Sequence, residues 1–283
     1  MKIIKYIVPA LLGGMLTLQS CEHFLDTKPT ETYSEELVWG SRSTADAFVL
    51  RTSPDILGLY HDFWGDDQIT LNTILRQSCP GEARDLINRE HDFGFNKFSI
   101  IRRCNLIIEQ ASEGKMRRAM IYYYHAKHCG RVIWVDRVLQ VDDEFNLPLT
   151  ESIDRTYDLI LSDLDDAIAG LPEEYPAGRA NANAARALKS EVCLTAAAYT
   201  TDAARKKTLW KQAVVAVDAI QGYSLDANYG GMFNQENSYS STEIILARYF
   251  SKENTNGGDT YMQTVIPNQG NDNLKKLGRG PLF

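Results

Sequence analysis

Two pairs of neighbouring carboxylates are the first residues in this sequence whose types and spacing could support chemistry. They are Asp66 with Asp67 and Asp142 with Asp143. A glycoside hydrolase needs two carboxyl groups, one acid and one base or nucleophile, roughly 5 to 10 Å apart. Adjacent acidic residues on a loop are, however, typical of a solvated face, and nothing else in the sequence marks either pair as catalytic.

A second possible site is the histidine pair in "YYYHAKHC", in which His125 and His128 are three residues apart. Such a pair can contribute to a metal site, but no third ligand accompanies it at a recognisable spacing. The sequence also lacks a Gly-x-Ser-x-Gly elbow, a phosphate-binding glycine loop and a dinucleotide fingerprint. We therefore expect no catalytic residue, no metal and no cofactor, and a protein that is not an enzyme.

Aromatic side chains in irregular segments indicate a binding site instead. Sugars are bound by flat apolar rings combined with polar groups that reach the hydroxyls. Tyr60 and Trp64 lie four residues apart at the expected end of a helix, although both rings could equally belong to the core. Trp210 lies within an amphipathic helix and is expected in the core. The candidate ligand-binding residues are Tyr60, Trp64, Asp66, Asp67, Trp39 and Trp134.

The N-terminal residues predict export and lipidation. Lys2 and Lys5 precede an apolar run of roughly a dozen residues, which is typical of a secretory leader and too short for a membrane span. The residues "LQS" before Cys21 look like the lipobox of bacterial lipoproteins. Cys21 is therefore the predicted lipidation site, where more than one acyl chain would give a stable anchor. The alternative is an ordinary leader with Cys21 as an incidental thiol, but leucine at position −3 does not favour it.

Length and charge narrow the class of protein. The chain has 283 residues and a formal net charge of −7. After the leader, enough residues remain for one large domain or two closely packed subdomains. No basic stripe is present, so nucleic acid is not an expected partner. The other cysteines lack zinc-site spacing, and the sequence does not say which of them could pair as disulfides: Cys79, Cys104, Cys129 and Cys193.

Apolar periodicity predicts a series of helices. Apolar residues recur at three- and four-residue steps, which places them on one helix face. Pro54 is expected to kink or split the first helix, Gly114 to follow the second as a stop, and Gly130 to end the third. Thr150 or Ser152 is expected to open the fourth. The predicted helices cover about 44–60, 96–110, 116–129, 152–170, 182–199 and 204–220.

The inward faces of these helices follow from the same periodicity. Phe98, Ile101, Cys104 and Ile108 are expected to share one face of the second helix. In the fourth helix, Asp163 is expected to fall outside the apolar stripe. The inward residues expected for the last helix are Trp210, Ala213, Val214 and Val217.

The last two helices are expected to form a pair. Together they span roughly 35 residues, the size of a tetratricopeptide hairpin, and the alanines of residues 182–199 allow close approach. Beyond Gly222 the chain is rich in Gly, Asn and Ser, and "EIILARYF" resembles a strand or a buried segment.

Six segments in this order resemble the N-terminal half of the SusD/RagB family, the nutrient-capturing surface lipoproteins of Bacteroidetes. One of them, "IIRRCNLII", matches an Ile-Arg-x-x-Asn helix of the family. One departure is "CGRVIWV", where the family usually has a Phe-Gly-Gly-Val-Pro-Leu turn. The six segments are "CEHFLDTKPTE", "IIRRCNLII", "RTYDLILSDLDDAIAGLPEEY", "GRANANAARALKSEVCL", "LWKQAVVAVDAIQGYSLDANYGGMF" and "STEIILARYF".

The resemblance implies a mostly α fold of tetratricopeptide-like helical hairpins with irregular loops and little strand. Residues 1–20 would be the signal peptide, 21–40 a tether, and 41–222 the N-terminal helical region. Residues 223–283 would begin a C-terminal region that is incomplete, because family members usually continue for about as many residues again. The chain therefore resembles a truncated product or a fragment.

The resemblance also implies a function. The protein would be anchored in the outer membrane, facing the cell surface, and would capture oligosaccharide without cleaving it. It would pass this ligand to a SusC-like TonB-dependent transporter. Two alternatives stay open: capture of peptide, as in the RagB branch, and a truncated scaffold without a working site.

Overall fold

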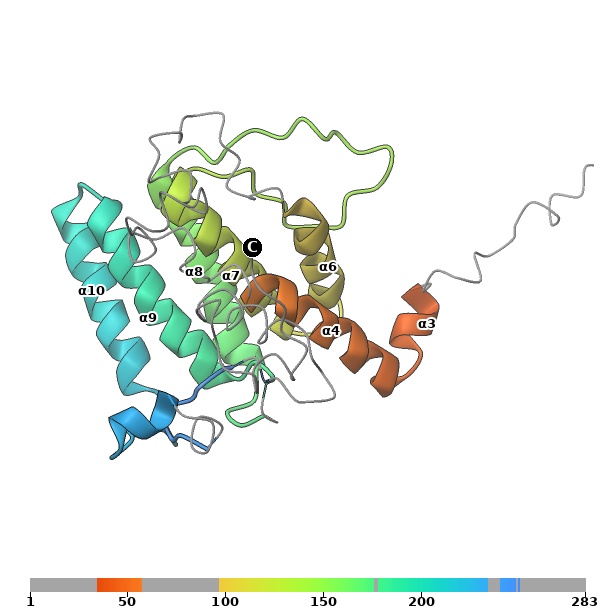
Figure 1. Cartoon of the computed structure of the whole chain (residues 1–283). Helices are drawn as coiled ribbons and strands as arrows, with labels where there is room; N and C mark the ends of the chain where they lie inside the picture. Colours follow the sequence, from red (N-terminus) through yellow and green to blue (C-terminus); the bar gives the residue numbers. More distant parts are fainter. Residues whose placement is uncertain (1–34, 58–96, 176–177, 234–239, 248, 250–283) are drawn as a thin grey trace, which may run out of the picture. The chain divides into compact units, whose positions relative to one another are not determined.

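The structure is a computed structural model that describes residues 35–57, 97–175, 178–233, 240–247 and 249 (Figure 1). The chain divides into two compact units, residues 1–48 and 49–283, and each is described by itself. Several predictions fall outside the described residues and stay predictions. They concern the leader, the lipidation site Cys21, and the candidate ligand-binding residues Tyr60, Trp64, Asp66 and Asp67.

The described part of the first unit contains a short helix and the start of a longer one. Helix α3 covers Glu35–Trp39, within the predicted tether, and α4 covers Arg42–Leu57. The Thr44 hydroxyl donates a hydrogen bond to the Val38 carbonyl at 2.7 Å. The ring of Trp39 meets the edge of Phe48, with ring centroids 5.6 Å apart. Helix α4 continues through Pro54, so a split of the helix at this proline is wrong, whereas the alternative of a kink stays a prediction.

In the second unit, the α helices between residues 98 and 218 pack each on the next along the chain. Helix α6 contacts α7, α7 contacts α8, α8 contacts α9 and α9 contacts α10 (Figure 1). Outside the helices, the described residues contain one isolated β-bridge, Ile133 with Leu149. The prediction of a mostly α fold is therefore confirmed. The elements are α6 (Phe98–Ile108), α7 (Glu113–Cys129), α8 (Ile153–Gly170), α9 (Ala182–Tyr199), α10 (Ala203–Asp218) and the 3-10 helix η5 (Tyr229–Phe233).

Side-chain caps explain where three of these helices begin. The Ser152 hydroxyl accepts a hydrogen bond from the Arg155 amide at 3.0 Å. At the start of α9, Asn181 Oδ1 accepts from the Ala184 amide at 2.8 Å. At the start of α10, Asp202 Oδ1 accepts from the Ala204 amide, also at 2.8 Å. Each cap satisfies an amide that has no partner within its helix.

Gly114 does not end a helix but permits close packing of two. It lies in the first turn of α7, which begins at Glu113, so its predicted role as a stop is wrong. A Cβ atom on Gly114 would lie 2.7 Å from the Cys104 carbonyl oxygen and 2.6 Å from the Ile108 amide nitrogen. Because both atoms belong to the α6 backbone, a larger residue would push α6 and α7 apart.

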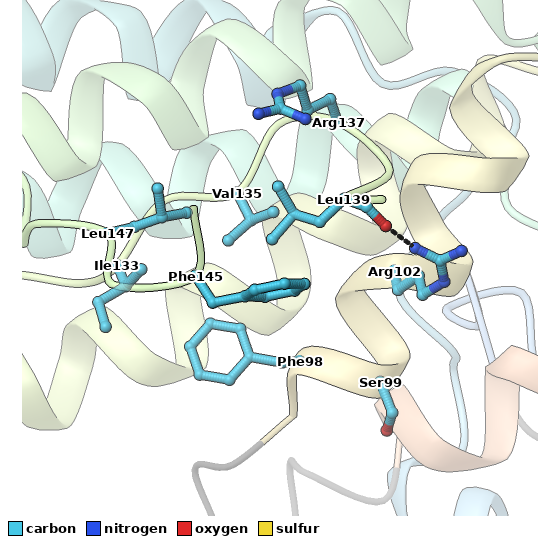
Figure 2. A pocket seen from close by; sticks show the side chains of 9 residues that line it. All are labelled: Phe98, Ser99, Arg102, Ile133, Val135, Arg137, Leu139, Phe145 and Leu147. Atoms are coloured by element: carbon cyan, nitrogen blue, oxygen red, sulfur yellow. Dashed lines mark hydrogen bonds between the residues drawn. The ribbon is translucent and has the colours of Figure 1, made fainter. Parts of the chain in front are cut away.

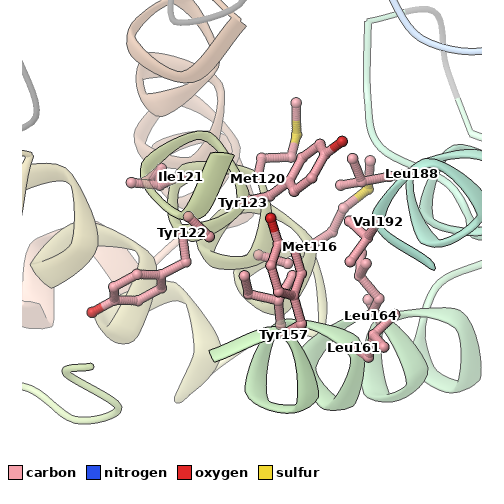
Figure 3. Packing of buried hydrophobic residues seen from close by; sticks show 14 of the residues in the cluster. Met116, Met120, Ile121, Tyr122, Tyr123, Tyr157, Leu161, Leu164, Leu188 and Val192 are labelled. Atoms are coloured by element: carbon pink, nitrogen blue, oxygen red, sulfur yellow. The ribbon is translucent and has the colours of Figure 1, made fainter. Parts of the chain in front are cut away.

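The core of the second unit lies between α7, α8 and α9 (Figure 3). Five alanines of α9 are buried, which confirms the predicted close helix approach. Ile245 and Leu246 pack partly buried against the core, so the described part of "EIILARYF" is a buried segment rather than a strand. The largest buried side chains include Tyr122, Tyr123, Tyr157, Met116, Ile121 and Leu164.

The buried face of α10 contains fewer large side chains than predicted. Trp210, Val214 and Val217 are 52%, 59% and 50% exposed, so their predicted burial is wrong. The buried residues are Leu209, Ala213 and Ala216. The two alanines present a small surface to the alanine-rich α9. Because this face of α10 packs on α9, the larger residues on the neighbouring face stay exposed.

The face predicted for α6 also needs correction. Ile101 and Cys104 are buried as expected, but Phe98 is 42% exposed. The other buried positions are Ile100, Asn105 and Ile107. The stripe is therefore rotated away from Phe98, which is left at the helix start.

Within the described residues, no helix is both long and apolar enough to cross a bilayer.

The described cysteines should differ sharply in reactivity. Cys104, Cys129 and Cys193 are free thiols, and only Cys129 of these three is exposed. Burial raises the pKa of Cys104 to about 12 and that of Cys193 to about 11. Because the thiolate is the reactive form, native protein treated with iodoacetamide at pH 8 should be modified at Cys129 at least ~100 times faster than at Cys104. Peptide mapping by mass spectrometry measures these rates, and equal rates would contradict the packing of α6 on α7.

Candidate functional site

A pocket of about 410 Å³ lies between α6 and the loop of residues 131–150 (Figure 2). Its volume falls within the range of small-molecule sites, and its walls are mainly apolar. Phe98 and Phe145 supply two aromatic rings, and Arg102 and Arg137 supply the charged groups. The lining residues are Phe98, Ser99, Arg102, Ile133, Val135, Arg137, Leu139, Phe145 and Leu147.

The polar residues of "IIRRCNLII" hold the loop that forms this pocket. Arg102 and Asn105, one turn apart on α6, both donate to loop carbonyls. Arg102 Nη1 donates to the Leu139 carbonyl, as Figure 2 shows. Asn105 Nδ2 donates to the Val135 carbonyl at 3.1 Å and to the Arg137 carbonyl at 2.8 Å. The Arg-x-x-Asn pair therefore fixes the position of the pocket wall.

Helix α7 also holds this loop in place. Arg118 Nη1 donates to the Asp136 carbonyl at 2.9 Å and to Asn105 Oδ1 at 2.8 Å. The Tyr122 hydroxyl accepts a hydrogen bond from the Val135 amide at 2.7 Å. Burial raises the pKa of Tyr122 well above its usual range, so the hydroxyl stays neutral. These bonds satisfy peptide groups that would otherwise be costly to bury.

Arg118 is itself fixed by a buried ion pair with Asp163 of α8. Its Nε and Nη2 atoms each lie 2.7 Å from one carboxylate oxygen of Asp163. Lys115 Nζ lies 3.2 Å from Asp163 Oδ1. Asp163 is only 3% exposed, so its predicted place outside the buried stripe is wrong. Its burial is possible because the cations of α7 compensate its charge.

Trp134 lies beside the pocket but does not line it. Its ring stacks on Tyr122 with centroids 4.2 Å apart, and the Arg118 guanidinium lies 5.2 Å from the ring centroid. The indole is half-buried and packs against the core, where it helps to hold the loop in place. Trp39 lies in the first unit. Ligand binding by these two tryptophans stays a prediction.

Asp143 stabilises the turn between the two arms of the loop. One of its carboxylate oxygens, Oδ2, accepts from Arg137 Nη1 and from the Gln140 amide, both at 2.6 Å. Asp142 is exposed in the same turn. The pair is therefore not arranged as a catalytic acid and base.

His125 and His128 do not face a common site. His125 is buried in the helix bundle, whereas His128 is exposed and its Nδ1 lies 3.0 Å from the Tyr124 carbonyl. The described ranges contain no cluster of three or more His, Cys, Asp or Glu side chains suited to a metal.

The turn at Asp143 should loosen in acid. The hydrogen bond from Arg137, and then that from the Gln140 amide, hold the pKa of Asp143 below its usual value of 3.8. A lowered carboxyl pKa stabilises the fold above pH ~4, and this contribution is lost as pH falls through the folded-state value. The Gln140 amide resonance should therefore shift with a midpoint below pH ~3.8. Asp143→Asn should abolish the transition, and a midpoint above pH ~4.5 in the native chain would contradict the contact.

The comparisons with known proteins agree on one fold. The chain is 25% identical over 141 residues to a SusD-like protein of Bacteroides ovatus. A SusD-like protein structure from Bacteroides fragilis matches 77% of this chain with a TM-score of 0.60 and 23% identity. A laminarin-binding SusD-like protein matches 72% with a TM-score of 0.55 and 21% identity. No family model matches the sequence.

These similarities confirm the resemblance noted in the sequence. The described helices have the SusD-like fold, and the sequence is similar to a SusD-like protein. The chain spans 26% of the B. ovatus protein, and 47% and 50% of the two solved structures.

None of the nine residues that line the pocket is among the predicted ligand-binding residues. The prediction includes Trp134 from the correct segment but not its neighbours Ile133 and Val135. The available signal was the pair Arg102 and Asn105 among the apolar residues of "IIRRCNLII", because a polar residue on a buried face needs a partner outside its helix.

Proposed function

We propose that this chain is part of a surface lipoprotein that captures oligosaccharide, with the pocket beside α6 as a binding site. The observation that carries the proposal is the pocket itself, in which the ring of Phe98 on α6 and the ring of Phe145 on the loop line the same space. Hydrogen bonds from α6 and α7 fix this loop. Aromatic rings bind the C–H faces of sugars, and the arginines can donate to sugar hydroxyls. The fold shared with a laminarin-binding protein supports the same ligand class.

In this proposal the protein binds its ligand without cleaving it. The pocket lining contains no carboxylate, so it lacks the acid and base that glycoside hydrolysis requires. We further propose that Cys21 carries the lipid anchor at the outer membrane and that a SusC-like TonB-dependent transporter receives the ligand. Both proposals depend on the leader sequence and the family resemblance.

Electrophoresis through gels that contain single polysaccharides tests this function. At least one polysaccharide should retard the protein, with an affinity of order 10 μM to 1 mM because a flexible ligand loses freedom on binding. A reducing-end assay on the same mixtures should show no new sugar ends. Absence of retardation by any polysaccharide would contradict glycan capture, and retardation by peptides alone would favour peptide capture. New reducing ends would contradict binding without cleavage.

A further inference from the structure

The charge of the pocket is opposite to that of the chain. The chain carries a formal net charge of −7, yet the charged side chains that line the pocket are Arg102 and Arg137. Asp143 offsets Arg137 through its hydrogen bond, whereas Arg102 donates to a neutral carbonyl. Among the described residues no carboxylate pairs with Arg102, which therefore contributes a positive charge at the edge of an apolar pocket.

The bond to Leu139 also orients the Arg102 guanidinium. It uses one N–H of Nη1 and leaves the other donors of the planar group for a ligand. A guanidinium held in place binds a carboxylate through two parallel hydrogen bonds, and such charged bonds are roughly twice as strong as neutral ones. A sugar hydroxyl cannot use this geometry fully.

We propose that the pocket selects oligosaccharides that carry carboxylates, such as uronic acid units, over neutral ones. This inference rests on the proposed function. The phenyl rings of Phe98 and Phe145 bind the faces of the sugar rings, and Arg102 binds the carboxylate at the edge of the pocket. Arg137 stays paired with Asp143, so this pair adds little net charge to the pocket.

The test compares oligogalacturonate with the same oligosaccharide after methyl esterification, which removes the charge and keeps the sugar. Calorimetry at low salt should show the acidic form binding at least ~10 times more tightly, and the ratio should fall as salt screens the exposed charges. Arg102→Gln should reduce the ratio to ~3 or less. Arg155→Gln is the matched control, because Arg155 is an exposed arginine of α8 that does not line the pocket, and it should leave the ratio unchanged.

The outcomes separate this inference from the proposed function. If the ester binds as tightly as the acid, acid selection is wrong while glycan capture stands. If neither form nor any neutral or sulfated oligosaccharide binds, the proposed function fails. If Arg102→Gln weakens both forms equally, Arg102 acts only by holding the loop and the inference is overturned. Tighter binding of a sulfated oligosaccharide than of oligogalacturonate would overturn selection for carboxylates.

Discussion

Replacing Arg118 by leucine should lower the free energy of unfolding by about 3 to 5 kcal/mol, because the change leaves the buried Asp163 without its main partner. The side chains of Arg118 and Asp163 are each 4% exposed. The variant also removes the donor to Asn105 and to the Asp136 carbonyl, so the pocket loop should loosen at the same time. Urea unfolding followed by circular dichroism measures the loss.

Two further variants make this prediction specific. Arg118→Leu combined with Asp163→Leu should recover part of the loss, because an apolar pair avoids the isolated charge. Arg155→Leu removes an exposed pair with Glu151 and should change stability by less than about 1 kcal/mol. A loss of under about 1 kcal/mol for Arg118→Leu would show that the buried pair does not support the fold.

Phe145→Ala should weaken oligosaccharide binding about tenfold, which corresponds to ~1.4 kcal/mol. The Phe145 ring is 63% exposed and lines the pocket, so its loss removes ligand contact but little core packing. The thermal midpoint should therefore stay within a few degrees of the unaltered protein. Calorimetric titration and thermal unfolding on the same samples measure both quantities.

Trp210→Ala is the matched control for the loss of an exposed ring. Trp210 is 52% exposed on α10 and does not line the pocket. Its removal should leave the affinity unchanged. Equal weakening by Trp210→Ala and Phe145→Ala, or a sharp fall in the thermal midpoint of Phe145→Ala, would show that the pocket is misassigned.

The sequence predicted those parts of the fold that depend on local signals. Ser152 caps α8 through an amide three residues away. The alanines of α9 are small, and this alone predicts that a neighbouring helix can approach closely. Trp210 was misassigned because the sequence of α10 offers two apolar stripes. Periodicity alone does not say which stripe meets α9, and the answer depends on the small residues of the neighbouring helix.

The pocket could not be predicted from local sequence signals, because its contacts join residues that are far apart in the sequence. Arg102 reaches Leu139 across 37 positions, and Arg118 reaches Asp163 across 45. The buried place of Asp163 follows from this partner and not from its own helix. Similarly, Phe98 has the spacing of a core residue on α6, but the loop that carries Phe145 makes it part of a pocket wall.

The crystal structure of the protein with a bound oligosaccharide tests the central claim most directly. The ligand should lie against Phe98 and Phe145, with an oxygen atom within about 3.2 Å of Arg102. A ligand bound only elsewhere, for example at the segment that contains Tyr60 and Trp64, would contradict the claim that the pocket beside α6 is the binding site.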